Sequence, residues 1–462
     1  MFSPDTYKKR RDELRNILQG GIALFPGNTD APYNYPANTY AFRQDSTFMY
    51  YFGLQEPGLA AVMDFDDGSE ILFGNDCTIN DIIWMGQQPS LNDKAAAIMM
   101  DQTQPYVALP DVLKKAQQQG RVIHFLPPYR AETKIHLWEL LGIPPAQQKD
   151  NASVPLVKAV VKMRMVKEPQ EIEQIEAAIT TTCQMHTYAM KNARSGMVEM
   201  ELSGAIEGIA LANGGRVSFP VILTVNGQIL HNHYHGNTMR DGQLLIIDTG
   251  AETAMGYAGD ITRTIPVSGR FDARQKAIYQ TVVQANLKGI EMSRPGVYYR
   301  DVHLAAARVI ADGLKDAGLL RGNMDDAVAQ GAHTLFFPHG LGHALGLDVH
   351  DMEGLGENYV GYDETISRST EFGLRSLRFG RRLEPNFALT VEPGIYFIPA
   401  LIDQWEAEKK LAEFIDYEAL KSFRDFGGIR IEDDILITDG GCRVLGQPIP
   451  KTVEEVEGVM NS

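Results

Sequence analysis

Four apolar, strand-like runs in the second half of the chain each carry a carboxylate at one end. The acids are Asp248 in LLIIDTG, Asp260 in GDITRT, Glu392 in LTVEPG and Glu432 in GIRIEDD. Burying an unpaired charge is costly, so acids in such places are normally paired with a cation or bound to one. Four acids in matching strand contexts therefore favour a shared cation site over four separate caps, turns or ion pairs.

Two of these acids are close in the sequence. Asp248 ends an apolar strand, and twelve residues later Asp260 begins what we interpret as the returning strand. A hairpin between the two strands would bring both carboxylates to one point.

A glycine-spaced, histidine-rich segment, HGLGHALGLDVHD, follows these strands. His339 and His343 have the i, i+4 spacing with which a helical HExxH motif binds zinc. Here Gly-Leu-Gly separates them, which disfavours a helix, and no glutamate follows His339. The segment is therefore not a zinc-protease motif of that type. In the NHYH cluster we expect substrate contact or packing for His233 and His235 rather than a separate metal site.

Four carboxylates and one imidazole form a hard, oxygen-rich ligand set. Such a set suits Mn²⁺ and similar divalent ions better than metals that prefer thiolates. One ion would be overcharged by so many anionic oxygens, whereas two ions sharing bridging carboxylates would be balanced. Paired metals about 3.5–4 Å apart can lower the pKa of a bridging water and polarise a carbonyl. The pattern predicts hydrolysis with a metal-bound hydroxide as the nucleophile.

The chain is organised as two domains. Short β-like runs alternate with helix-compatible stretches in the first 150 residues, which predicts a mixed α/β domain. Proline, glutamine and small polar residues concentrate at 144–155, which we interpret as a linker. We therefore expect an N-terminal domain over 1–153 and a catalytic domain over 154–462.

The second domain has helical and strand-like signals in turn. Apolar residues at three-to-four spacing predict helices over 168–193 and 198–213, and two more follow at 272–293 and 299–319. The strand-like segments between and after them predict an antiparallel sheet covered by helices, an α+β fold. The charged segments 353–383 and 399–426 are expected to be surface insertions.

Composition excludes several classes of protein. The 43 basic and 59 acidic residues give a net charge of −16, which argues against a nucleic-acid binder. The N-terminal segment lacks the pattern of a signal peptide, and no run approaches the about 20 apolar residues of a membrane span. Three cysteines cannot form a disulfide framework. We expect a cytoplasmic protein.

As an ordered set, DTG…YAGDITRT, HGLGHALGLDVHD, LTVEPG and GIRIEDD resemble the motifs of metallopeptidases with the pita-bread fold. Within them the resemblance is closest to the Xaa-Pro aminopeptidase (aminopeptidase P) family, with prolidases next. In the first half, FRQDSTFMYYFGLQEPGLAAV is similar to the N-terminal domain of aminopeptidase P. The resemblance covers nearly the whole chain and implies an α/β N-terminal domain before a pita-bread catalytic domain.

The resemblance also implies which residues bind metal. It makes a dinuclear site, most simply for two Mn²⁺ ions, of Asp248, Asp260, His343, Glu392 and Glu432. Proton transfer from the hydroxide is assigned to Glu392, because a ligand carboxylate lies within hydrogen-bond reach of it.

Further residues take roles by the same resemblance. His350 would bind the substrate and assist the transition state, and His231 would steady the tetrahedral intermediate. His339 would line the proline-side pocket. Arg430 would belong to the network that binds proline and supports the metal ligands.

The activity implied is release of the N-terminal residue from peptides with proline in second position. The alternative is a prolidase, which takes only dipeptides; a non-catalytic pita-bread binding protein is disfavoured because all five ligands are present. Methionine aminopeptidases generally lack a domain like residues 1–150, and creatinase lacks the complete ligand set. Members of the family are often dimers or tetramers, so we expect a homo-oligomer.

The sequence departs from the family pattern in two places that concern the substrate. Phe219 stands where a tyrosine is usual, which puts a hydroxyl role there in doubt. The insertions at 353–383 and 399–426 could reshape the mouth of the site and shift the preferred substrate length.

Overall fold

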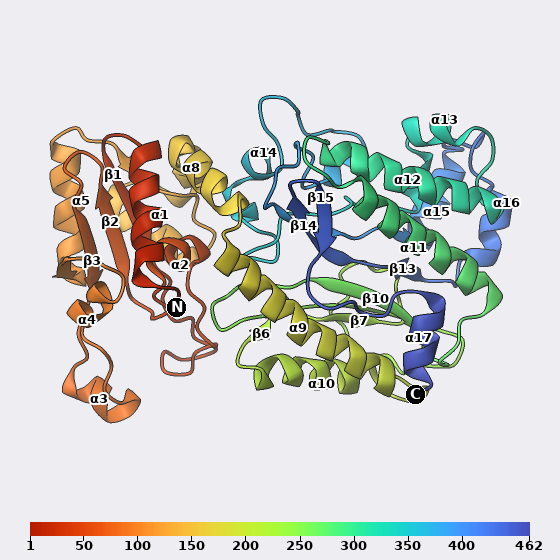
Figure 1. The fold of residues 1–462 in the computed structure, drawn as a ribbon, viewed down its shortest axis with the longest axis horizontal. Helices are drawn as coiled ribbons and strands as arrows, with labels where there is room; N and C mark the ends of the chain where they lie inside the picture. Colours follow the sequence, from red (N-terminus) through yellow and green to blue (C-terminus); the bar gives the residue numbers. More distant parts are fainter. The chain divides into compact units, whose positions relative to one another are not determined.

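The computed structural model describes residues 1–462, which divide into two compact units (Figure 1). The first unit comprises residues 1–164 with 352–359, and the second comprises 165–351 with 360–462. The division falls near the end of α8 (Val154–Met165). This helix belongs with the first unit because Tyr50 donates a hydrogen bond to the carbonyl of Met163, and Arg164 donates to Thr47.

The first unit is the mixed α/β domain that the sequence predicts. Its five-stranded sheet has the order β4-β3-β2-β1-β5, with antiparallel pairs at the centre and a parallel pair at each edge. The sheet strands are β1 (Ile22–Pro26), β2 (Ala60–Asp64), β3 (Glu70–Gly74), β4 (Gln102–Pro105) and β5 (Ile123–His124). The helices of this unit before α8 are α1 (Pro4–Ile17), α2 (Ser46–Phe52), α3 (Ile79–Met85), α4 (Leu91–Ala96), α5 (Leu109–Gln118), α6 (Ala131–Leu141) and α7 (Gln148–Asn151).

The segment 144–155 is folded and is not an open linker. It contains the 3₁₀ turn Pro145–Gln147 and α7. Gln148 is buried there, and its amide donates to the carbonyls of Lys134 and Ile143. Polar composition at this place therefore reflects hydrogen bonding to the backbone.

The four long helices of the second unit lie where the apolar spacing predicts them. They are α9 (Pro169–Asn192), α10 (Glu199–Ala212), α11 (Ala273–Met292) and α12 (Tyr299–Asp316). Proline at the first position suits the start of α9, and the carboxylate of Asp272 accepts a hydrogen bond from the backbone of Gln275 at the start of α11. The helices α9 and α10 pack together, as do α11 and α12 (Figure 1).

The strands of the second unit pair antiparallel throughout, which confirms the α+β fold. One sheet has the order β10-β8-β7 and another β11-β14-β15, while β12 pairs with β13 and β6 with β9. Their bounds are β6 (Arg216–Val217), β7 (Ile222–Thr224), β8 (Leu244–Thr249), β9 (Ala251–Glu252), β10 (Ile261–Pro266), β11 (Ala388–Val391), β12 (Gly394–Tyr396), β13 (Gly428–Arg430), β14 (Asp433–Thr438) and β15 (Gly441–Val444). Shorter helices complete the unit: α13 (Met324–Ala329), α15 (Pro399–Ala407), α16 (Tyr417–Leu420) and α17 (Val453–Met460), while α14 (Glu357–Val360) lies at the division between the units.

Two of the predicted strand runs are interrupted, and the interruptions face each other. The run LTVEPGIY divides into β11 and β12 around Glu392, and GIRIEDD divides into β13 and β14 around Glu432. The register pairs Val391 with Asp433 on one side of the breaks and Gly394 with Arg430 on the other. Proline follows Glu392 and has no N–H for a strand ladder. Both acids are thus placed outside the regular ladder.

None of the helices combines the length and apolar character that a membrane span requires. The three cysteines are free thiols, in agreement with the prediction that they form no disulfide framework.

Candidate metal centre and active site

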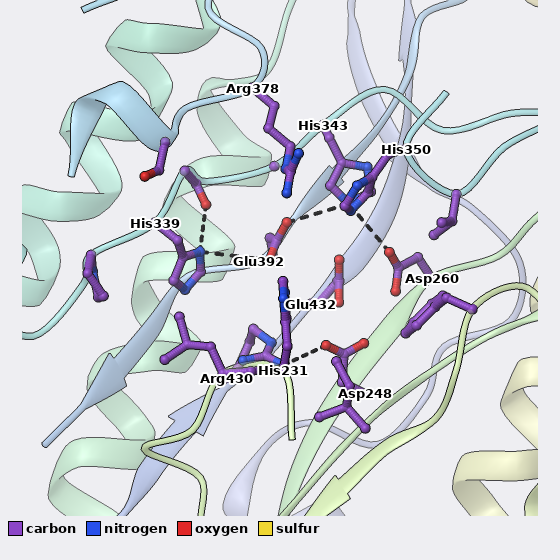
Figure 2. Close-up of a pocket in the computed structure, with 18 of the residues that line it drawn as sticks. His231, Asp248, Asp260, His339, His343, His350, Arg378, Glu392, Arg430 and Glu432 are labelled. Atoms are coloured by element: carbon purple, nitrogen blue, oxygen red, sulfur yellow. Dashed lines mark hydrogen bonds and ion pairs between the residues drawn. The ribbon is translucent and has the colours of Figure 1, made fainter. Parts of the chain in front are cut away.

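All the predicted site residues line one cavity of about 790 Å³ in the second unit (Figure 2). They come from strands and loops that are far apart in the sequence. The set is His231, Asp248, Asp260, His339, His343, His350, Glu392, Arg430 and Glu432.

The predicted hairpin places the first two acids together. Asp248 is the last-but-one residue of β8, and Asp260 immediately precedes β10. The antiparallel register puts Thr262 opposite Asp248, so the two acids approach from neighbouring strands. Both are buried, at 8% and 4% exposed.

His343 lies in an extended loop, and no helix forms between it and His339. The loop follows the edge of β11: Thr390 exchanges backbone and side-chain hydrogen bonds with His343. A Cβ on Gly342 would lie 2.0 Å from the carbonyl oxygen of Thr390, so only glycine permits this approach. The absence of a helix confirms that the segment is not an HExxH motif.

The imidazole of His343 points its Nε2 atom at the acids. Its Nδ1 atom lies 3.1 Å from the carbonyl of Ala344, while Nε2 is 3.4 Å from Asp260 Oδ2 and 3.6 Å from Glu392 Oε1. Ligand atoms of Asp260, His343 and Glu432 all lie within 4.8 Å of one another. Such a spacing suits a metal ion between them.

The charges of the cluster call for a cation. Burial, followed by the Asp248 carboxylate, raises the pKa of Asp260, and burial together with Asp260 raises the pKa of Glu432. Burial also raises the pKa of Glu392 to about 7. The Oδ1 atom of Asp260 is buried with no hydrogen-bond partner. This oxygen-rich donor set therefore fits divalent cations, which would stabilise the ionised acids.

Arg430 connects the acids to the neighbouring wall of the cavity. Its guanidinium donates to Asp248 Oδ2 at 2.5 Å and to the Tyr396 hydroxyl at 2.8 Å. Its Nε atom donates to the Thr262 hydroxyl at 3.2 Å, which in turn donates to Glu432 Oε2 at 2.6 Å. The network fixes two of the predicted ligands.

Tyr396 and Thr262 are parts of this network that the sequence reasoning missed. Each lies a few residues from an acid of the cluster, in GIYF after Glu392 and in DITRT after Asp260. A polar side chain in a fully buried strand next to a candidate ligand is a signal that could have identified both.

The other predicted histidines surround the acids. The His339 Nε2 atom lies 2.9 Å from the Tyr396 hydroxyl, and burial followed by Arg430 lowers the pKa of His339 to about 3. His231 is open to solvent through the cavity, but partial burial by the cavity walls, with Arg430, lowers its pKa as well. The rings of His343 and His350 meet edge to face at 4.1 Å. Of the NHYH cluster, His233 lines the cavity and His235 lies 3.1 Å from the carbonyl of Val221.

A buried ion pair involves Asp351, the residue after His350, and the sequence reasoning missed it. Lys167 Nζ donates to Asp351 Oδ2 at 3.0 Å, and each side chain is 1% exposed. The backbone N–H of Asp351 also donates to the carbonyl of Ala344. These contacts fix the turn that presents His350.

The insertions, expected at the surface and at the mouth of the site, also contribute side chains to the cavity. Within 353–383, Phe372, Ser376 and Arg378 line the cavity. So do Ala400, Leu401 and Gln404 at the start of the second insertion, and Ile398 just before it. Apart from Arg378, most of their charged residues are exposed or half-buried on the outer surface, whereas apolar residues such as Leu377 and Trp405 are buried. Charge in these segments thus marks one face of a structure whose other face packs inward.

Comparisons with known proteins identify the family of this chain. The family model described as metallopeptidase family M24 matches residues 173–439, and that of the aminopeptidase P N-terminal domain matches residues 7–124. The human Xaa-Pro dipeptidase is 33% identical over 452 residues, covering 96% of this chain and 89% of its own. The Xaa-Pro aminopeptidase of Escherichia coli is 31% identical over 472 residues, covering 99% and 98%.

Solved structures are similar over the whole chain. Proline aminopeptidase P II from Yersinia pestis superposes with a TM-score of 0.82 at 29% identity, covering 100% of both chains. Zinc-substituted Escherichia coli aminopeptidase P in complex with product gives 0.80 at 31% identity, covering 100% and 98%. The chain therefore belongs to metallopeptidase family M24, with an aminopeptidase P N-terminal domain in front of a pita-bread catalytic domain.

Proposed function

We propose that this metallopeptidase is an Xaa-Pro aminopeptidase, which releases the N-terminal residue from peptides that have proline in second position. The observation that carries the proposal is one cavity in which the carboxylates and histidines adjoin a wall that includes His339 and Arg430. The buried Tyr396 hydroxyl holds both of these side chains. Figure 2 shows His339 on one side of the acids and His350 on the other. A peptide can therefore contact the acids and this wall at the same time.

Five residues that line the cavity would hold two divalent cations, in the first place Mn²⁺: Asp248, Asp260, His343, Glu392 and Glu432. The divalent ions would supply Lewis-acid chemistry there: a polarised scissile carbonyl and a water of lowered pKa, so that hydroxide is the nucleophile. The structure of zinc-substituted Escherichia coli aminopeptidase P shows that this relative also accepts zinc.

Proton transfer falls to Glu392. Its carboxylate lies 3.6 Å from His343 Nε2, and bound divalent cations would keep it ionised, so it can accept a proton from the attacking water. It can then give this proton to the proline nitrogen, which leaves as a secondary amine. His231 and His350 line the same cavity and would hydrogen-bond to the carbonyl oxygen as negative charge develops on it.

We assign recognition of proline to the wall of the cavity that contains His339. An Xaa-Pro bond is a tertiary amide without an N–H, so a site for it needs shape and no backbone acceptor. His339 is held by Tyr396 and is neutral at pH 7, and its ring can pack against the pyrrolidine. The free N-terminal ammonium would be attracted by the acids, which favours cleavage of the first residue only.

Prolidase is the second candidate, and two observations favour it. The human relative named Xaa-Pro dipeptidase is as similar to this chain as the bacterial aminopeptidase is. Arg378 also lines the cavity, and a guanidinium there could bind the terminal carboxylate of a dipeptide.

Hydrolysis of Ala-Pro-Ala and of Ala-Pro, with Mn²⁺ and after chelation, tests both candidates. Metal-dependent cleavage of the tripeptide supports the aminopeptidase. Cleavage of the dipeptide alone makes the protein a prolidase, and Arg378→Met should then raise KM for the dipeptide. Cleavage of neither peptide with metal bound would reject an Xaa-Pro activity.

The proposal includes a homo-oligomer in the cytoplasm that binds peptides and no nucleic acid or membrane. The helix α3 supports the oligomer, because Ile83, Trp84 and Met85 on it are 70%, 78% and 75% exposed. An apolar patch of this kind marks an interaction surface. The free thiols suit a reducing compartment. Light scattering of the wild type and of Trp84→Ser tests the oligomer, which the variant should weaken.

A further inference from the structure

The two insertions pack on each other and form one wall of the cavity. The rings of Phe372, in the first insertion, and Trp405, in the second, lie 6.0 Å apart. The ammonium of Lys410 lies over the Trp405 ring, with Nζ 3.8 Å from the ring centre. Since Trp405 is 3% exposed, this contact anchors both segments. The two insertions are therefore packed against each other through buried side chains in this wall.

The helix α15 divides its side chains between the core and the cavity. Ile402 and Trp405 are buried, three residues apart on one face. Leu401 and Gln404, also three residues apart, line the cavity together with Ala400. Ile398, just before the helix, and Phe372 line it too. The insertions therefore add a mainly apolar extension to the site.

The extension adjoins the wall to which the proposed function assigns proline. Ile398 follows two residues after Tyr396, whose hydroxyl contacts both His339 and Arg430. A volume of about 790 Å³ lies in the upper part of the range of about 300–1,000 Å³ for small-ligand sites. The cavity thus has room for more than the proline ring.

We propose that Phe372, Ile398, Ala400 and Leu401 form a subsite for an apolar side chain on the residue that follows proline. This inference rests on the proposed aminopeptidase function and deepens it. The substrates it selects are peptides of the type Xaa-Pro-Leu or Xaa-Pro-Phe. Gln404 and Ser376, which also line the cavity, supply polar groups for the peptide backbone beyond proline.

The expected selectivity follows from the apolar lining. Partial burial of a leucine side chain should favour Ala-Pro-Leu over Ala-Pro-Gly by about tenfold in kcat/KM. A third residue with a charge would be desolvated without a partner, so Ala-Pro-Asp and Ala-Pro-Lys should be poorer substrates than Ala-Pro-Leu.

The test replaces one apolar side chain of the subsite with a charged one. In the Mn²⁺-loaded enzyme, Leu401→Asp should abolish the preference for leucine and make Ala-Pro-Lys the better substrate, because the new carboxylate faces the third residue. The control Ala407→Asp places the same charge on the exposed end of the same helix and should leave the preference unchanged. Leu401→Ala, a milder change, should reduce the preference severalfold, and thermal melts report whether each variant folds.

The outcomes separate the subsite from the activity. Cleavage of all tripeptides at equal kcat/KM, or an unchanged leucine preference in Leu401→Asp, overturns the subsite while the aminopeptidase stands. Cleavage of Ala-Pro alone overturns both. If no peptide is cleaved, the activity fails, and calorimetric binding of Ala-Pro-Leu and Ala-Pro-Gly decides the subsite: equal affinities reject it.

Discussion

Arg430 donates a 2.5 Å hydrogen bond from Nη2 to Oδ2 of Asp248, and the two side chains are 4% and 11% exposed. The same guanidinium donates to Tyr396, which contacts His339. The Arg430 guanidinium therefore orients the proposed metal ligand Asp248 and, through Tyr396, the ring of His339. Because the pair is buried, its geometry is set by the fold and is little affected by salt.

Replacement of Arg430 should damage metal binding and turnover together. In Arg430→Met, Asp248 loses its donor, so we expect the affinity for Mn²⁺ to fall about 10–100-fold, as for other residues that orient metal ligands. We expect kcat/KM to fall by about 10²–10³. Calorimetric metal titration and peptide hydrolysis measure the two effects. Arg443→Met, which removes an exposed arginine paired with Glu176, is the matched control and should change neither.

Metal removal should expose the repulsion among the buried acids. The raised pKa of Asp260 means that the metal-free fold resists its ionisation. The unfolded chain ionises this group near pH 4, so the metal-free protein should lose stability as pH rises above that value, until the folded pKa is passed. Addition of Mn²⁺ should raise the melting temperature at pH 7, because the ion binds only the folded state.

The variant Asp260→Asn should therefore have two opposite effects. Without metal it should melt at a higher temperature than the wild type at pH 7, because a buried charge is gone. Addition of Mn²⁺ should raise the melting temperature of the variant only slightly, and the variant should hydrolyse no peptide. The exposed Asp241→Asn is the control and should follow the wild type in both conditions. A lower melting temperature for metal-free Asp260→Asn would contradict the repulsion.

The Lys167–Asp351 pair should act on His350 through the turn between them. Lys167→Met leaves a buried carboxylate without its ammonium, and we expect the free energy of unfolding to fall by about 3–5 kcal/mol. The double variant Lys167→Met/Asp351→Leu removes both charges and should recover most of that stability. If the pair positions His350, the double variant should still have a reduced kcat, whereas a purely structural role would restore it. Urea unfolding and kinetics distinguish the two.

The sequence predicted the four long helices and the hairpin of Asp248 and Asp260 because these depend on local signals, apolar periodicity and strand alternation. It also predicted that nine residues form one site, which all line the cavity. It missed the facing breaks in the strands at Glu392 and Glu432, since a break opposite another break is set by pairing between distant segments.

The inward face of the insertions was missed for a related reason. In 399–426 the charged residues dominate the composition, but Trp405 and Ile402 are buried by contacts with segments elsewhere in the chain. The pair of Lys167 and Asp351 joins positions 184 residues apart, so no local pattern reports it. What the sequence lacks in each case is the identity of the long-range neighbour.

Two buried histidines behind the proline wall should make the fold sensitive to acid. His303 and His333 are each 1% exposed, and no hydrogen-bond partner contacts their ring nitrogens. Burial lowers the pKa of His303 to about 3 and that of His333 to about 4. Both rings are neutral in the folded state, while the unfolded chain binds protons near pH 6.5. The contribution of these two neutral rings to the free energy of unfolding is therefore fully present above pH 6.5, and it is lost as pH falls toward 4.

The variant His303→Leu should flatten this dependence. Between pH 7 and pH 5 one such histidine contributes about 2 kcal/mol to the loss of unfolding free energy, by proton linkage. Urea unfolding at the two values should show a smaller loss for His303→Leu than for the wild type, by that amount. Phe337→Leu, which changes a buried ring 5.2 Å from His303, is the control, since it should lower stability equally at both pH values. An unchanged slope in His303→Leu would mean that the folded protein protonates this ring, and that burial does not hold it neutral.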